Sequence, residues 1–84
     1  IGHDALLRCL DHADFRVREA ALQQLAQRAL PADQPAIEAR LADPQWRVRM
    51  AAAQTLAELP FVALDDLLQR AEPDSPAHAV LDHV

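Results

Sequence analysis

Apolar residues recur along the chain at the spacing of an α-helix. The segment over residues 15–29 places Val17, Ala21 and Leu25 on one face, and apolar residues four positions apart are typical of an amphipathic helix. Asp14 stands just before this segment, where a carboxylate can cap the first free backbone N–H groups. The pattern therefore predicts a helix over about residues 15–29.

Five further helices are predicted in the same way, joined by short polar turns. The first helix runs from an Asp4 cap to about residue 10 or 11. The third runs from about 33–35 to the turn at Asp43-Pro44, and the fourth runs from that turn to about 59. The fifth and sixth cover 62–71 and 77–83. Asp33 and Ser75 are the expected caps of the third and sixth helices, and a proline follows each cap within the first turn.

The pattern repeats with a fixed offset of 31 residues (48 − 17). Phe15-Arg16-Val17-Arg18 aligns with Trp46-Arg47-Val48-Arg49, and Ala20, Ala21 and Leu25 align with Ala51, Ala52 and Leu56. A period of this length is the signature of stacked repeats. We place repeat 1 at about residues 3–30, repeat 2 at about 32–59 and a degenerate or terminal repeat 3, which lacks the Arg-Val-Arg, at about 61–84.

Helices joined by short turns pack antiparallel, and stacked pairs share one continuous core. The single glycine and the lack of alternating β-branched residues argue against a sheet. A chain of 84 residues suffices for one small domain. The prediction for residues 1–84 is therefore a single all-α domain, a short right-handed α-solenoid of antiparallel helix pairs with about five or six helices.

The pattern Leu-x-Asp-Pro-x-x-x-Val-Arg-x-x-Ala-Ala-x-x-x-Leu resembles a HEAT repeat, of the short class first noted in phycobilisome bilin-lyase proteins. Repeat 2 fills it with Leu41, Asp43, Pro44, Val48, Arg49, Ala52 and Leu56. Repeat 1 fits more loosely, with His12 and Ala13 at the Asp-Pro positions. The resemblance is specific for fold and says little about function, because such repeats are scaffolds with many unrelated tasks.

In this family the arginine after the core valine forms a ladder with carboxylates of the turns. The resemblance therefore implies a structural ladder that contains Arg18 and Arg49. A cation near a helix N-terminus is also disfavoured by the helix dipole and usually needs a carboxylate partner. The candidate partners are Asp14, Asp43 and Asp11.

Phe15 and Trp46 occupy matching positions at the turns and are candidate partner-binding residues, because exposed aromatic side chains are common interface anchors. The alternative is that both rings cover a neighbouring turn. Arg16 and Arg47 are candidates beside them, and with the ladder arginines they offer a second interpretation, a row that binds anions.

Charge is unevenly distributed, with a net value of −5. Seven arginines balance seven acidic residues up to Ala57, whereas six acidic residues accompany only Arg70 from Glu58 onward. Nucleic-acid binding needs a basic face, so a nucleic-acid partner is disfavoured. The apolar runs are too short to span a bilayer, and the lone Cys9 cannot form an internal disulfide. We expect a cytoplasmic protein, and the arginine and alanine usage is typical of a bacterial one.

No catalytic or metal-binding pattern is evident. Cys9 and His12 lie three positions apart with His3 nearby, a spacing that can hold two ligands, but no second cluster completes a site. No Ser-His-Asp set, acid–base carboxylate pair or glycine-rich loop is recognisable. We therefore predict no enzyme, no cofactor and no metal.

The leading hypothesis is a non-catalytic scaffold that binds a protein partner on a concave surface lined by the second helices, with an acidic end that attracts a basic segment. The resemblance also suggests an accessory subunit or fragment of a tetrapyrrole (bilin) lyase or cofactor-maturation protein, and third a DNA-binding repair protein. Apolar residues at both ends, such as Leu6 and Leu81, predict either self-association through the repeat ends or a place in a longer array.

Overall fold

The structure is a computed structural model that describes residues 2–84, and this part of the chain is all helical. Ile1, with which the predicted domain begins, lies outside the described residues. The helices are α1 (His3–Cys9), α2 (Phe15–Arg28), α3 (Gln34–Ala39), α4 (Trp46–Glu58), α5 (Leu64–Arg70) and α6 (Pro76–Leu81), with 3-10 turns η1 (Pro31–Asp33) and η2 (Arg40–Ala42) on either side of α3. The predicted all-α class is confirmed.

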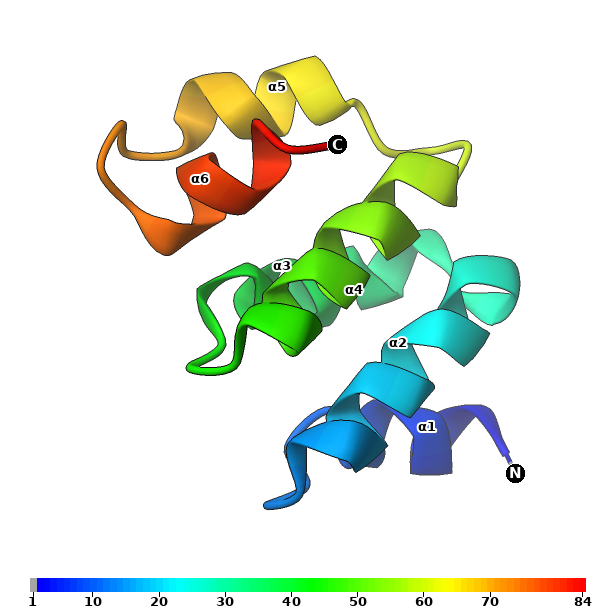
Figure 1. The fold of residues 1–84 in the computed structure, drawn as a ribbon. Helices are drawn as coiled ribbons and strands as arrows, with labels where there is room; N and C mark the ends of the chain where they lie inside the picture. Colours follow the sequence, from blue (N-terminus) through cyan, green and yellow to red (C-terminus); the bar gives the residue numbers. More distant parts are fainter. Residues whose placement is uncertain (1) are drawn as a thin grey trace.

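The helices stack in pairs into a short solenoid (Figure 1). α2 and α4 lie side by side in the middle, with α1 against α2 at one end and α5 with α6 beyond α4 at the other. α3 packs against α4, so each odd-numbered helix pairs with the even-numbered helix that follows it. The second helix of each pair therefore lies next to the second helix of the neighbouring pair. The limits of the three repeats stay a prediction.

Small side chains bring α2 and α4 into close contact. Ala51, Ala52 and Ala53 are all buried on α4, and Ala52 is 0% exposed. The Thr55 hydroxyl donates a hydrogen bond to the Leu22 carbonyl oxygen across the contact, at 2.8 Å, so the buried hydroxyl has a partner. This contact fixes how the outer faces of α2 and α4 lie relative to each other.

The predicted helix caps are confirmed in part. The Asp14 carboxylate accepts a hydrogen bond from the Arg16 N–H at the start of α2, and the Ser75 hydroxyl caps α6. The prediction for Asp4 is wrong, because α1 begins at His3 with its N-cap at Gly2, two residues before the predicted cap. Asp4 instead lies in the first turn, where its charge complements the helix dipole.

Asp33 does not cap α3 with its side chain. The carboxylate turns back and accepts hydrogen bonds from the Leu30 N–H at 2.8 Å and from His3 Nε2 at 2.6 Å. The physical reason is the 3-10 turn that precedes α3, which points this side chain toward the end of α2. Asp33 thereby connects α1 to the second helix pair.

The last helix pair is offset by one residue fewer than the earlier pairs, because α5 and α6 begin 30 residues after α3 and α4 (64 − 34 and 76 − 46). The N-cap residues are Asp14, Gln45 and Ser75, which gives spacings of 31 (45 − 14) and 30 (75 − 45) residues. The position two residues before the N-cap is therefore His12, then Asp43, then Pro73. In the last pair, proline replaces aspartate at this position.

Candidate functional site

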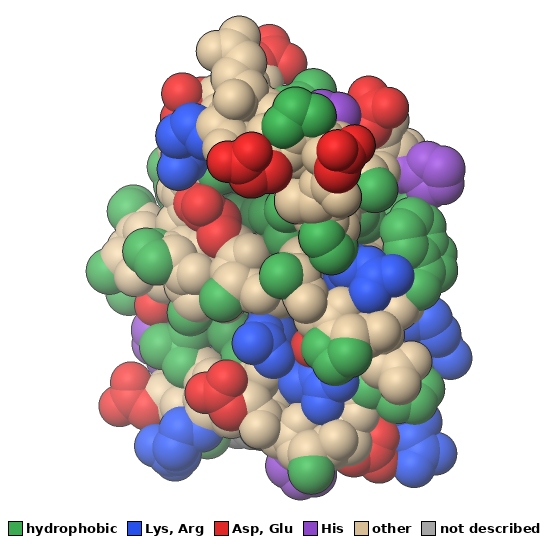
Figure 2. All heavy atoms as spheres, turned by 90° about the vertical axis from the view of Figure 1, so that its left-hand side faces the viewer, with side chains coloured by type: hydrophobic (Ala, Val, Ile, Leu, Met, Phe, Trp, Pro, Cys, Tyr) green, Lys and Arg blue, Asp and Glu red, His purple; other side chains and the backbone are tan. Residues whose placement is uncertain are grey.

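The beginnings of α2, α4 and α6 lie along one edge of the solenoid, which we call the turn edge and define by residues 12–18, 43–49 and 73–75. Figure 2 shows this side of the molecule. Arginine side chains lie mainly in its middle and lower parts, whereas acidic side chains gather at the top, toward α5. The turn edge contains every ladder residue and every partner-binding residue predicted from the sequence, apart from the candidate carboxylate Asp11, which lies just before it.

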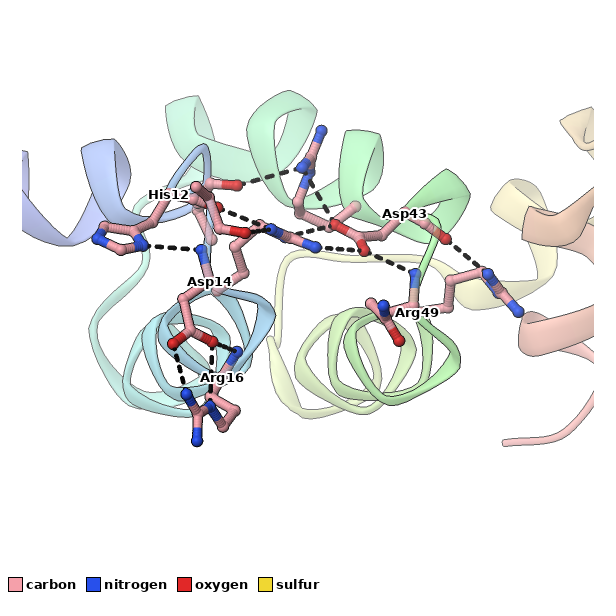
Figure 3. Close-up of polar contacts among 10 residues, drawn as sticks. His12, Asp14, Arg16, Asp43 and Arg49 are labelled. Carbon is pink, nitrogen blue, oxygen red and sulfur yellow. Dashed lines mark hydrogen bonds and ion pairs between the residues drawn. The ribbon is translucent and has the colours of Figure 1, made fainter.

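Asp43 is the centre of a buried ion-pair network on this edge (Figure 3). Its side chain is 0% exposed and accepts two hydrogen bonds from Arg18, from Nε at 2.8 Å and from Nη2 at 3.0 Å. Arg40 Nη1 lies 3.2 Å from Oδ2, and the Gln45 N–H donates to Oδ1 at 2.9 Å. One carboxylate therefore joins α2 to the turn that begins α4.

The Arg18–Asp43 pairing is one of those that the resemblance implied, whereas Arg40 was missed. Its signal in the sequence was a basic residue three positions before the aspartate. Arg40 also donates to the Leu10 carbonyl oxygen at 3.2 Å, which ties the end of α1 into the network.

Burial raises the pKa of the Asp43 carboxyl group, but other effects outweigh burial. Hydrogen bonds from Arg18 and from the Gln45 N–H, together with the positive charges of Arg18 and Arg40, hold this pKa below its ordinary value. The network is therefore built for an ionised aspartate.

Acid should weaken the fold through Asp43. Because its pKa is lowered in the folded state, the stability that it contributes is present above the ordinary carboxyl pKa of 3.8 and is lost as pH falls through the lower, folded-state value. We expect the urea midpoint of the wild-type protein to fall more steeply than that of Asp43→Asn between about pH 5 and pH 2. Parallel pH profiles for the two proteins would contradict this assignment.

Asp14 lies outside the buried network. It pairs with Arg16, whose Nη2 lies 2.8 Å from Oδ2, and not with Arg18. Hydrogen bonds from the side chain and backbone of Arg16 lower the pKa of Asp14 to about 2. Arg18 instead donates Nη1 to the His12 carbonyl oxygen at 2.7 Å. Of the predicted ladder carboxylates, Asp43 alone meets a ladder arginine with its side chain in residues 2–84.

Arg49 takes the same pose as Arg18 in the next repeat, but without a carboxylate. Its Nη1 donates to the Asp43 carbonyl oxygen at 2.6 Å, which corresponds to the bond from Arg18 to His12. Its Nε is buried and has no hydrogen-bond acceptor. The guanidinium carbon lies 5.4 Å from the centre of the Trp46 ring. The carboxylate partner expected for Arg49 is absent from the ion pairs of the described chain.

Trp46 is 43% exposed, and its ring meets the His83 ring edge-on, with centroids 5.4 Å apart. Phe15, at the equivalent position of the first repeat, is only half-exposed and lies under the Arg47 guanidinium, 5.9 Å from its ring centre. The structure therefore presents Trp46 to solvent more fully than Phe15.

Arg16 and Arg47 each have a carboxylate partner. Arg16 pairs with Asp14, and Arg47 Nη2 lies 3.0 Å from Glu19 Oε1 on the neighbouring helix. Because both positive charges are compensated, a row of these arginines has little charge left for an anion. The arrangement favours a structural role for the two residues over an anion-binding row.

A groove of about 530 Å³ runs between α2 and α4 on their outer faces. Its lining residues are Gln23, Ala26, Ala51, Gln54, Thr55, Ala57, Glu58 and Val84. Two pairs obey the repeat offset, Gln23 with Gln54 and Ala26 with Ala57. Sequence reasoning missed the glutamines, although the offset of 31 residues already relates them. Trp46 begins the same helix as Gln54, eight residues earlier, and is not among the residues that line the groove.

The candidate metal ligands serve in separate contacts. His3 bonds Asp33, and His12 Nδ1 accepts a hydrogen bond from the Asp14 N–H. Cys9 is half-buried in an apolar groove at the α1 end of the solenoid. Across residues 2–84, no group of three His, Cys, Asp or Glu side chains is placed to hold a metal ion.

A family model described as HEAT repeats matches residues 3–81, which include all six helices. No curated protein and no solved structure matches the chain. No helix in the described chain has the length and apolar character needed to cross a membrane.

Proposed function

The chain belongs to the HEAT repeat family, and we propose that it is a non-catalytic scaffold that holds an extended segment of a partner protein across α2 and α4. HEAT repeats are commonly protein-interaction scaffolds. The observation that carries the proposal is the matched pair Gln23 and Gln54, which line one groove from equivalent positions of two repeats.

The spacing of this pair suits a peptide backbone. Packed helices lie about 8–10 Å apart, and an extended chain advances about 3.3 Å per residue. The two amides therefore match backbone groups about three residues apart, and each amide offers both a donor and an acceptor. Ala26 and Ala57 add little bulk to the groove, which leaves room for a backbone to approach.

The chemistry of the groove supports binding over catalysis. Glu58 is the one ionisable side chain among the described residues that line it, so no acid–base pair is present there. Its negative charge, with the acidic C-terminal third of the chain, favours a basic residue in the bound segment. Trp46, exposed at the start of the same helix, offers an apolar anchor for a segment that continues along α4.

Selection from a displayed library of random peptides tests the proposal. We expect peptides to be enriched on the wild-type protein, and Gln54→Ala to weaken their binding about fivefold, because a neutral hydrogen bond contributes roughly 1 kcal/mol. Gln69→Ala is the matched control, since Gln69 is an exposed glutamine on α5, outside the groove. The proposal fails if no peptide is enriched, or if both variants weaken binding equally.

The bilin-lyase alternative rests on the resemblance alone. The DNA-binding alternative is disfavoured, because the two most exposed arginines of the turn edge, Arg16 and Arg47, are already paired with carboxylates.

A further inference from the structure

The last arginine of the turn-edge ladder, Arg49, lacks the carboxylate partner that Arg18 has. Arg18 donates Nη1 to a carbonyl oxygen of its own turn and donates Nε and Nη2 to the carboxylate of the next turn. Arg49 makes the first of these contacts, to the Asp43 carbonyl oxygen, but its Nε has no acceptor. We call the side of Arg49 that presents Nε and Nη2 its Nε edge.

The offset of 30 residues (76 − 46) in the last helix pair explains the missing carboxylate. Counted from the N-cap of α6, Pro73 stands where Asp43 stands before α4. Asp74 is the aspartate that the offset of 31 would align with Asp43, but the deletion of one residue moves it out of position. Asp74 is exposed and has no ion pair within residues 2–84.

An unpaired guanidinium in this position is unfavourable for the isolated protein. A buried donor without an acceptor costs free energy, and a cation in the first turn of a helix is opposed by the helix dipole. A carboxylate at the Nε edge removes both penalties, as Asp43 does for Arg18. A planar carboxylate also fits the two parallel donors of a guanidinium.

We propose that the Nε edge of Arg49, together with Trp46, binds an Asp or Glu side chain of a partner polypeptide, with an apolar residue of the same segment packed on the indole. This inference rests on the proposed scaffold function and names the partner's chemistry. Trp46 stacks on the Arg49 guanidinium and is 43% exposed. A bound segment therefore meets the cation and an apolar surface together.

The surrounding charges favour one carboxylate over a polyanion. Figure 2 shows acidic side chains above the arginine-rich part of the turn edge, and the whole chain carries −5. Arg16 and Arg47 are neutralised by Asp14 and Glu19. A run of phosphates would be repelled by these acidic side chains and would find few cations without a carboxylate partner. The turn edge therefore favours an acidic peptide over a nucleic acid.

Trp46 reports directly on occupation of the site, because it is the sole tryptophan of the chain. The Nε atom is covered in the free protein, so a carboxylate reaches it by moving a neighbouring side chain. The indole, which stacks on the guanidinium, is the exposed neighbour. We therefore expect the emission of Trp46 to change when an acidic peptide binds.

The test uses peptides selected on the wild-type protein, each made with its acidic residue and again with Asn or Gln in its place. We expect the neutral peptide to bind about tenfold more weakly. Arg49→Gln should cause a loss of the same size and remove the difference between the two peptides. Arg47→Gln is the matched control and should change affinity less than about twofold, because that arginine is exposed and paired with Glu19.

Pro73→Asp gives an independent check. It restores an aspartate to the ladder position, so we expect a higher urea midpoint, a weaker affinity for the acidic peptide and little Trp46 response. This variant keeps the test decisive even if Arg49→Gln is poorly folded.

Several results would overturn the inference. They are equal binding of the acidic and neutral peptides, equal losses in Arg49→Gln and Arg47→Gln, or displacement of the peptide by a short single-stranded oligonucleotide. Selected peptides that depend on Gln54 but not on Arg49 would retain the scaffold function and reject this site. A library that yields no binding peptide would reject both.

Discussion

Asp43→Ala should remove a large part of the stability of this domain. The substitution leaves Arg18 and Arg40 without the buried carboxylate that they share and frees the Gln45 N–H at the start of α4. Breaking a buried ion pair by removing one partner costs about 3–5 kcal/mol. Small domains have a total free energy of unfolding of roughly 0.05–0.15 kcal/mol per residue, about 4–13 kcal/mol for this length.

Urea denaturation followed by circular dichroism measures this loss. Asp14→Ala is the matched control, because Asp14 also accepts hydrogen bonds from a backbone N–H and from an arginine, but in an exposed position. We expect the control to lose much less stability, because the carboxylate that it removes is exposed and screened by solvent. Equal losses in the two variants would show that burial of the Asp43 network adds nothing.

Leu56→Ala should have the second large effect. Leu56 is 0% exposed on α4 and corresponds to Leu25 of α2 in the repeat. Truncation of a buried leucine costs about 2–5 kcal/mol, through lost transfer free energy and the cavity that remains. The effect belongs at the upper end of this range if the alanine-rich contact between α2 and α4 is too tight to close the cavity.

The control for this substitution is Leu30→Ala. Leu30 is 56% exposed, so its truncation should change the free energy of unfolding by less than about 0.5 kcal/mol. Both changes remove the same atoms, and the difference between them isolates burial. A loss below about 1 kcal/mol in Leu56→Ala would contradict the core described here.

The helical fold was predictable because its causes are local and repeated. Apolar residues four positions apart define α2 and α4, and the offset of 31 residues relates one helix to the other. The caps were less predictable, since Asp33 has a capping sequence but turns toward Leu30 and His3 in the folded chain. Its direction depends on a 3-10 turn that the apolar pattern does not encode.

The turn edge was predicted only in part. The ladder arginines and Asp43 stood out through the repeat, but the choice between Asp14 and Asp43 for Arg18 depends on how α2 meets the next turn. The missing partner of Arg49 follows from one deleted residue before α6, which moves Asp74 out of position. From the sequence alone this last part of the chain aligns with repeat 2 at an offset of either 30 or 31, and the position of the Ser75 cap identifies the offset of 30.

The most direct test of the account is the NMR signal of the arginine Nε–H groups in the free protein and with an acidic peptide added. We predict that the Arg18 Nε–H is shifted by its carboxylate in both states. The Arg49 Nε–H should lack this shift in the free protein and acquire it with the peptide. An Arg49 signal that is already shifted before the peptide is added, or that does not respond to it, would contradict the account.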